Sequence, residues 1–178
     1  MNEWPRIESV LSEYSAAELM DLLKDLYHAD PKTALFLETR VLKSDNALGV
    51  YKEKIKEALR ADPADEEASA WNAIGDYRSA SGHDEGTAEL MVAYVEVGNQ
   101  FTLDYGDIDE HYYFAMEKAF AKAIDHLLAM KRRRKDIDPY KDRLRRVVVS
   151  TKGIGWGYHD ALADFFYEAF GESESGTK

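Results

Sequence analysis

The sequence predicts an all-α protein built from antiparallel helix hairpins. Apolar residues recur at spacings of three and four along most of the chain, which is the pattern of helices that bury one face. Several of these segments begin with serine or aspartate, followed by a glutamate three residues later or by a proline, as helix N-termini do. No alternation of apolar and polar residues is long enough to predict a strand. The β-branched run 147–149 lies inside a helical pattern.

The first half of the chain is expected to form short helices. Ser15 and Glu18 have the spacing of a capping box, in which each side chain accepts a hydrogen bond from an otherwise unpaired backbone N–H. The helix that follows carries its apolar face at Leu19, Leu22, Leu23, Leu26 and Tyr27. The next helices begin at Asp30 and Pro31, near Asp45, and around Trp71, Ile74 and Tyr77, with turn residues at 62–65 between the last two.

The second half is expected to form longer helices. Residues 81–84 break the pattern, and Gly106 ends the helix after them. Asp107 or Asp109 caps the following helix, which ends in the basic run 131–135. The expected apolar faces are Leu90, Tyr94, Val97, Phe101 and Tyr105, then Tyr113, Met116, Phe120, Ile124 and Leu127, then Tyr140, Leu144, Val147 and Val148 after Asp138 and Pro139, and finally Tyr158, Leu162, Phe165, Phe166 and Ala169.

One domain is expected over residues 1–171, with residues 172–178 as a disordered C-terminal tail. A chain of 178 residues is long enough for one well-buried core and short for two. The short connections favour antiparallel neighbours. Two arrangements stay open, a multi-helix bundle and a short solenoid-like array, and no repeat of about 34 to 47 residues with a shared motif decides between them.

Charge and composition narrow the classes of partner. The net charge of −11 repels phosphate backbones and anionic head groups, so we expect no nucleic acid and no membrane as partners. The absence of cysteine excludes disulfides, thiolate metal sites and a cysteine nucleophile. The first residues do not resemble a signal peptide, and no apolar run approaches the roughly 18 residues of a membrane span. We therefore expect a cytoplasmic protein.

Four segments of the chain resemble a known family. They are LKDLYH (23–28) with FLETR (36–40), YGDIDE (105–110) and GIGWGYHD (153–160). Together they resemble an uncharacterised bacterial family, a domain of unknown function of the DUF6155 group, and the similarity spans most of the chain. The resemblance implies an all-helical, soluble protein without an assigned activity, and it supplies no catalytic residues.

Residues 153–160 are the most informative stretch, because three alternating glycines precede a His-Asp pair. The glycines either end one helix and let its neighbour pass closely, or let the backbone approach a ligand. A phosphate-binding loop needs a preceding strand and a different spacing. His159 either satisfies its hydrogen bonds in the interior or acts as a ligand or proton carrier, since an ordinary histidine pKa near 6.5 suits both roles.

Acidic residues form the other candidate positions. Asp107 and His111 are four apart and could share a helix face that holds a divalent metal, although helix capping explains the acids as well. No histidine has a glutamate three residues before it, which argues against a di-iron bundle. Asp76 and Glu96 lie within helical patterns and need a partner if buried, for which His159 and Arg78 are conceivable.

The basic run 131–135 has two interpretations. Five basic residues at a helix C-terminus complement the helix dipole, so a solvated helix end is one. A docking patch for an acidic partner, including a second copy of this acidic chain, is the other. Nucleic acid is not favoured, because aromatic residues do not interleave the run.

Two functions are carried forward. The leading hypothesis is a non-enzymatic helical protein-interaction module whose partner is an unknown protein or a second copy of the chain. It assigns no catalytic residues, no metal ligands and no cofactor. The alternative is a small-molecule or divalent-metal binding protein with a pocket between residues 105–111 and 153–160. Its candidate ligand-binding residues are Asp76, Glu96, Asp107, Trp156, Tyr158 and His159.

Overall fold

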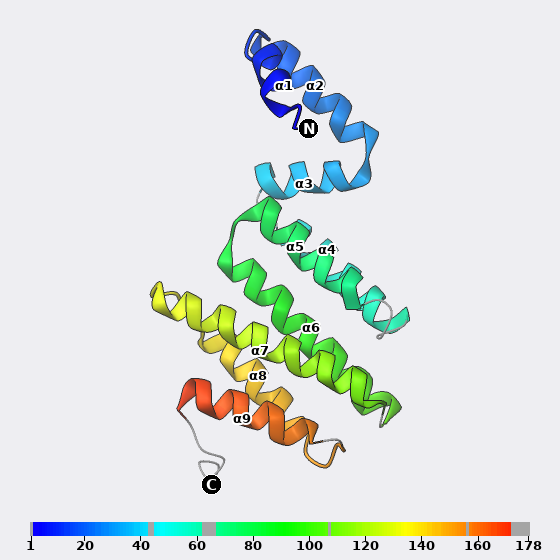
Figure 1. Ribbon diagram of the computed structural model, residues 1–178, viewed down its shortest axis with the longest axis vertical. Helices are drawn as coiled ribbons and strands as arrows, with labels where there is room; N and C mark the ends of the chain where they lie inside the picture. The colour runs from blue at the N-terminus through cyan, green and yellow to red at the C-terminus, as the bar shows by residue number, and fades with distance from the viewer. Residues whose placement is uncertain (1, 43–44, 62–66, 107, 156, 172–178) are drawn as a thin grey trace.

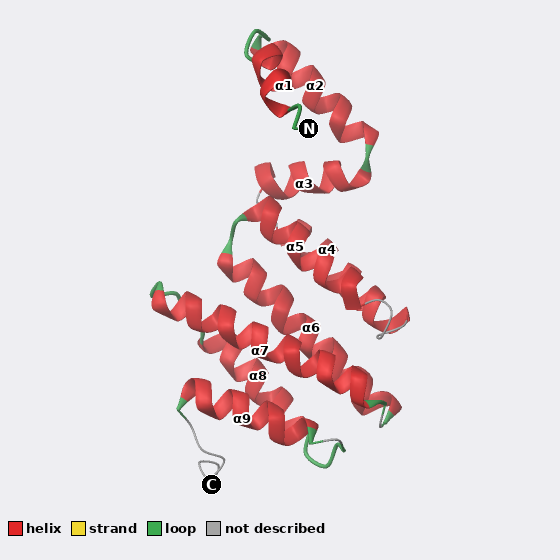
Figure 2. Cartoon of the chain, viewed as in Figure 1, coloured by secondary structure: helices red, strands yellow, loops and turns green. Residues whose placement is uncertain are grey.

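The computed structural model describes residues 2–42, 45–61, 67–106, 108–155 and 157–171. Within these ranges all regular secondary structure is α-helical, which confirms the predicted all-α fold (Figure 2). In chain order the helices are α1 (Trp4–Leu11), α2 (Ala16–Ala29), α3 (Pro31–Leu42), α4 (Asp45–Ala61), α5 (Glu67–Ser81), α6 (Asp84–Tyr105), α7 (Glu110–Arg132), α8 (Asp138–Ser150) and α9 (Tyr158–Phe170).

The helices follow one another along the long axis of the molecule, with α1 and α2 at one end and α9 near the other (Figure 1). The α4–α5 pair packs against α6, and α6 and α7 run antiparallel to each other. Helix α8 also packs against α6, and α9 packs against α7. The fold is therefore a multi-helix bundle drawn out along one axis, in which each hairpin packs on the next.

The core is centred on α6 and α7, which lie in the middle of this stack. One continuous apolar cluster runs from Leu35 in α3 to Phe166 in α9. The β-branched residues Val147 and Val148 are buried inside α8, as their helical pattern predicts. The largest completely buried side chains are Tyr94, Tyr113, Tyr158, Phe120, Phe166, Ile55, Leu59, Leu90, Met116, Leu127, Met130 and Leu144.

Several helix ends match the sequence prediction. The Ser15 hydroxyl accepts a hydrogen bond from the Glu18 N–H at 3.3 Å, and the Ser15 N–H donates to the Glu18 carboxylate at 2.7 Å, so the capping box is confirmed. Asp109 caps α7, because its carboxylate accepts from the Tyr112 N–H at 2.7 Å. Gly106 ends α6 with a φ of 85°. The predicted tail, residues 172–178, lies outside the described residues.

The N-terminal arm, which is α1 and α2, departs from the prediction of a buried apolar face. Both helices are described in full, and neither contains a buried residue. Leu23 and Leu26 are 42% and 44% exposed, whereas Leu19 and Leu22 are half-buried. The physical reason is that α2 packs against α3 and makes no comparable contact with another described helix, so much of its apolar face has nothing to cover it.

Candidate functional site

Glu96 is part of an ion network between α4, α6 and α8. Arg143 donates two hydrogen bonds to the Glu96 carboxylate, at 2.8 and 2.6 Å, and one to Glu89 at 2.5 Å. Lys52 reaches the other Glu89 oxygen at 2.7 Å. Desolvation opposes the charge on Glu89, but hydrogen bonds from Lys52 and Arg143 outweigh it and hold the pKa of this carboxyl below its ordinary value. The network joins three helices, so Glu96 has a structural partner.

Hydrogen bonds of His159 connect the start of α9 to the end of α8. Its Nδ1 lies 2.9 Å from the Thr151 hydroxyl and 3.1 Å from the Val148 carbonyl. Thr151, which is buried, donates to the same carbonyl at 2.7 Å. His159 is half-buried rather than interior, and these contacts match the part of the prediction in which it satisfies its hydrogen bonds within the chain. Gly157, with a φ of 70°, supplies the left-handed turn from which α9 begins.

Tyr158 lies in the core rather than on a pocket wall. Its ring contacts the Tyr113 ring at a centroid distance of 4.9 Å, and the side chain is completely buried. Burial raises the pKa of the Tyr158 phenol. Among the described residues its hydroxyl has no hydrogen-bond partner. A buried, unpaired hydroxyl is costly and calls for an explanation, such as a bound water or ligand.

A hollow lies beside residues 110 and 111, but none of the described residues of 153–160 lines it, so it is not the predicted pocket between the two segments. The hollow has a volume of about 480 Å³ and lies along the start of α7, lined by Glu110, His111, Tyr113, Phe114 and Glu117. Burial raises the pKa of the Glu117 carboxyl. The contact between Tyr113 and Tyr158 brings this region next to the start of α9. Asp107 and Trp156, two of the predicted lining residues, lie outside the described residues.

Metal ligands do not gather at the described positions. Among residues placed by the structure, no group of three or more histidine, aspartate or glutamate side chains could hold a metal ion. Asp107 lies outside the described residues, so the predicted metal-binding pair of Asp107 and His111 is not described. The alternative role that the sequence offered for the acids was helix capping, and Asp109 caps α7.

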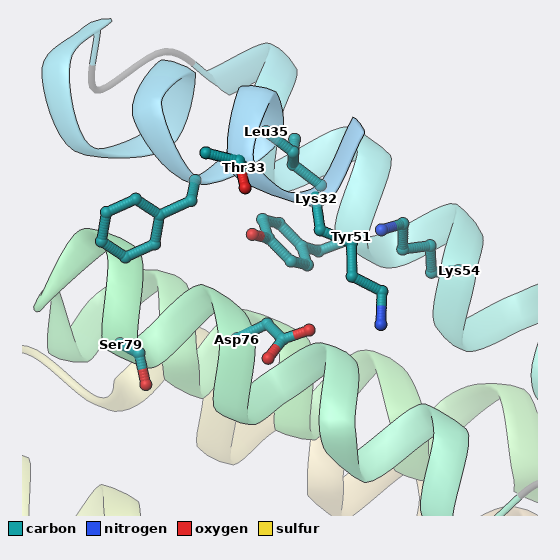
Figure 3. A pocket seen from close by; sticks show the side chains of 8 residues that line it. Lys32, Thr33, Leu35, Tyr51, Lys54, Asp76 and Ser79 are labelled. Carbon is teal, nitrogen blue, oxygen red and sulfur yellow. The ribbon is translucent and has the colours of Figure 1, made fainter. Parts of the chain in front are cut away.

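Asp76 lines a different hollow, between α3, α4 and α5 (Figure 3). The hollow has a volume of about 340 Å³, and the Lys32, Lys54 and Asp76 side chains extend into it. Leu35 and Tyr51 form its apolar floor. The two predicted interior acids, Asp76 and Glu96, therefore lie on different sides of the α4–α5 pair and do not share a site.

Exposed apolar side chains gather on the N-terminal arm. We call seven of them the arm stripe: Trp4, Ile7, Val10, Met20, Leu23, Leu26 and Tyr27. Trp4 is 56% exposed and Met20 66%. The periodicity of Leu23, Leu26 and Tyr27 was visible in the sequence and was interpreted as a face turned inward, whereas Met20 was not part of that predicted face. The α1 members were missed, because an eight-residue helix offers too short a pattern to predict.

The basic run at the end of α7 is partly neutralised within the chain. Arg133 contacts the Asp84 carboxylate at 2.6 Å, and Lys135 contacts Glu85 at 2.5 Å. Both acids lie in the first turn of α6, where they also complement the positive end of the helix dipole. These pairs join the end of α7 to the start of α6 and favour the interpretation as a solvated helix end over a docking patch.

Comparison of the chain with protein-family models, with curated proteins and with solved structures found no match. The resemblance to the DUF6155 group therefore stays a prediction. No helix in the described part of the chain has both the length and the apolar character that crossing a membrane requires.

Proposed function

We propose that this chain is a non-enzymatic helical protein-interaction module that binds a helical protein surface through the arm stripe. The single observation that carries the proposal is the arm itself, in which two adjoining amphipathic helices contain no buried residue. Large exposed apolar patches on soluble proteins mark interaction sites more often than chance. The arm stripe contains seven large, exposed apolar side chains within 24 residues.

Helix energetics support the same proposal. Isolated helices shorter than about 12 to 15 residues are marginal in water, and protein helices owe most of their stability to the burial of an apolar face. Helices α1 and α2 have 8 and 14 residues, and their own chain covers little of that face. The capping box at Ser15 favours helix but cannot replace burial. A partner surface is the missing source of stability.

The test compares two variants of the tagged full-length chain after chemical cross-linking in cells. Leu23→Glu places a charge on the arm stripe, whereas Ala29→Glu places the same charge at an exposed position on the side of α2 opposite Met20. The proposal predicts cross-linked species that Leu23→Glu abolishes and Ala29→Glu preserves. Cross-linking that both variants share, or that the wild type lacks, would contradict it.

The cytoplasm is the proposed location, which cell fractionation of the tagged chain tests. Nucleic acid is not a proposed partner, because the net charge of −11 opposes a phosphate backbone.

A second candidate function is small-molecule binding at the hollow along α7. The observation that favours it is the unpaired, buried hydroxyl of Tyr158, whose ring packs against Tyr113. Tyr113 lines the hollow together with Glu110, Glu117 and a second aromatic ring. Carboxylates with aromatic faces suit a small organic cation. A divalent metal is the other version of this function, and it depends on Asp107.

Thermal shift against a panel of small amines and divalent metals tests this second function. A compound at about 100 times its dissociation constant stabilises the folded chain by roughly 2.7 kcal/mol. The shift should disappear in Glu117→Gln and persist in Glu168→Gln, a control at the other end of the α7–α9 pair. No shift with any compound, or equal shifts in both variants, would rule the α7 hollow out.

A further inference from the structure

The arm stripe has the character of a surface that pairs with itself. Its members are aliphatic or aromatic, and the one hydroxyl among them, on Tyr27, already donates to Glu38 at 2.7 Å. Apart from the indole N–H of Trp4, the arm stripe therefore presents apolar surface, with little to anchor a chemically distinct partner. An apolar stripe along a helix is complementary to a second copy of itself, and a two-fold axis brings the same patch of each copy together.

The exposed area of the arm stripe is close to what a stable dimer needs. Its side chains are between 39% and 66% exposed. Aromatic side chains carry on the order of 150 to 250 Å² each, and applying this range to all seven members gives an upper value of roughly 700 Å² of exposed area on each copy. Stable protein interfaces bury about 800 Å² on each partner. Pairing of two arms would thus supply most of a standard interface without help from the rest of the chain.

The acidic residues of α2 do not oppose this pairing at the contact itself. Successive helix residues are rotated by about 100°. That rotation puts Glu18, Asp21 and Asp25 on the side of α2 opposite Met20, Leu23 and Tyr27. Lys24 is the charged residue of α2 nearest the arm stripe in this rotation. When two stripes meet, the acidic residues of α2 therefore face solvent, where salt screens their repulsion.

We infer that the occupant of the arm stripe is a second copy of this chain, and that two α1–α2 arms pair to form an intermolecular four-helix unit. This inference rests on the proposed function and names the partner. Two helical hairpins with apolar faces can share one core in such a unit, with helices packed nearly antiparallel. The α3–α9 body of each copy remains outside the interface.

Sedimentation equilibrium of the full chain tests the inference. The chain mass is 20.3 kDa. The average mass should rise toward twice this value as the concentration increases from about 1 µM to about 300 µM. Leu23→Glu should weaken the dimer by at least about 100-fold, because each dimer then buries two unpaired charges. Met20→Glu should act in the same way, and Ala29→Glu, on the side of α2 opposite Met20, should leave the dissociation constant within about threefold of the wild type.

Circular dichroism of each variant shows whether the body has kept its fold, since the core cluster contains no residue of α1 or α2. A wild-type mass that stays at 20.3 kDa over the whole range would overturn the inference. So would a dimer that survives both Leu23→Glu and Met20→Glu. A monomeric chain whose cross-linking in cells still depends on Leu23 would overturn the second copy as partner while leaving the proposed interaction module in place.

Discussion

The N-terminal arm and the α6–α7 pair carry the same kind of apolar periodicity and reach opposite outcomes. In α6 and α7 the periodic residues, such as Tyr94 and Phe120, are completely buried between neighbouring helices. In α2 the equivalent residues, such as Leu23, stay exposed because α3 is the helix on which α2 rests. The periodicity of a segment thus specifies a helix with an apolar face, while burial depends on whether a second surface lies opposite.

The largest expected effect is on the unfolding free energy, when one substitution in the α6–α7 pair is compared with one in the N-terminal arm. Phe120→Ala should destabilise the chain by about 3 to 5 kcal/mol, because it leaves a cavity in a fully packed core. Leu23→Ala should change the unfolding free energy by less than about 0.5 kcal/mol in dilute protein, as surface substitutions do. Urea unfolding at low micromolar concentration gives both values. A loss at Leu23 comparable with that at Phe120 would show that the arm is buried in the monomer.

The ion network around Arg143 should give the next largest effect, with a pH dependence. Arg143→Met leaves the half-buried Glu96 without its partner and Glu89 with Lys52 alone, and it should cost about 1.5 to 3 kcal/mol at pH 7. The folded-state pKa of Glu89 is lowered, so its contribution is present above the ordinary glutamate pKa of about 4.3 and is lost as pH falls through the folded value.

The destabilisation by Arg143→Met should therefore shrink when unfolding is measured at about pH 3. Arg146→Met, at an exposed position of the same helix, provides the control and should be nearly neutral at both pH values. A difference between Arg143→Met and the wild type that is the same at pH 7 and at low pH would contradict the assigned role of Glu89.

Two glycines inside helices offer a matched pair within the body. A Cβ at Gly86 would overlap the ring and hydroxyl of Tyr77, whereas a Cβ at Gly75 meets no atom within 4 Å. Gly86→Ala should destabilise by about 1 to 3 kcal/mol through overpacking. Gly75→Ala should stabilise by up to about 1 kcal/mol through helix propensity. Thermal melts compare them, and the same sign for both would contradict the packing of α5 on α6.

The smallest expected effect on global unfolding is that of Ser15→Ala. This change removes the capping box of α2 but touches no residue of the core cluster. The midpoint of global unfolding should stay within experimental error, while amide exchange in residues 16–20 should become faster. A clear fall in the global midpoint would indicate that the arm and the body unfold as one unit.

Much of the fold could be predicted from the sequence because local chemistry determines it. The helix ends are examples: the capping box of Ser15 and Glu18 begins α2, Asp109 caps the start of α7, and Gly106 ends α6. Val147 and Val148 followed the helical period despite their β-branched side chains. These features depend on residues within one or two helical turns, which the sequence displays directly.

The candidate site was harder to predict because it depends on contacts between distant segments. Glu96 was expected to need a partner, but that partner is Arg143, 47 residues away, rather than His159 or Arg78. Asp76 lies beside Lys32 and Lys54, which no spacing in the sequence brings near it. The arm stripe is exposed because α3 alone among the described helices packs substantially against α2. The sequence of α2 does not show whether another helix covers its apolar face.

Hydrogen exchange at two protein concentrations tests the central claim most directly, because it follows the arm and the body in the same experiment. The account predicts that amides of α1 and α2 exchange rapidly at about 1 µM and become protected at about 300 µM, whereas amides of α6 and α7 are protected at both. Arm amides that are as protected as those of α6 in the dilute protein would contradict it, as would arm amides that exchange rapidly at every concentration.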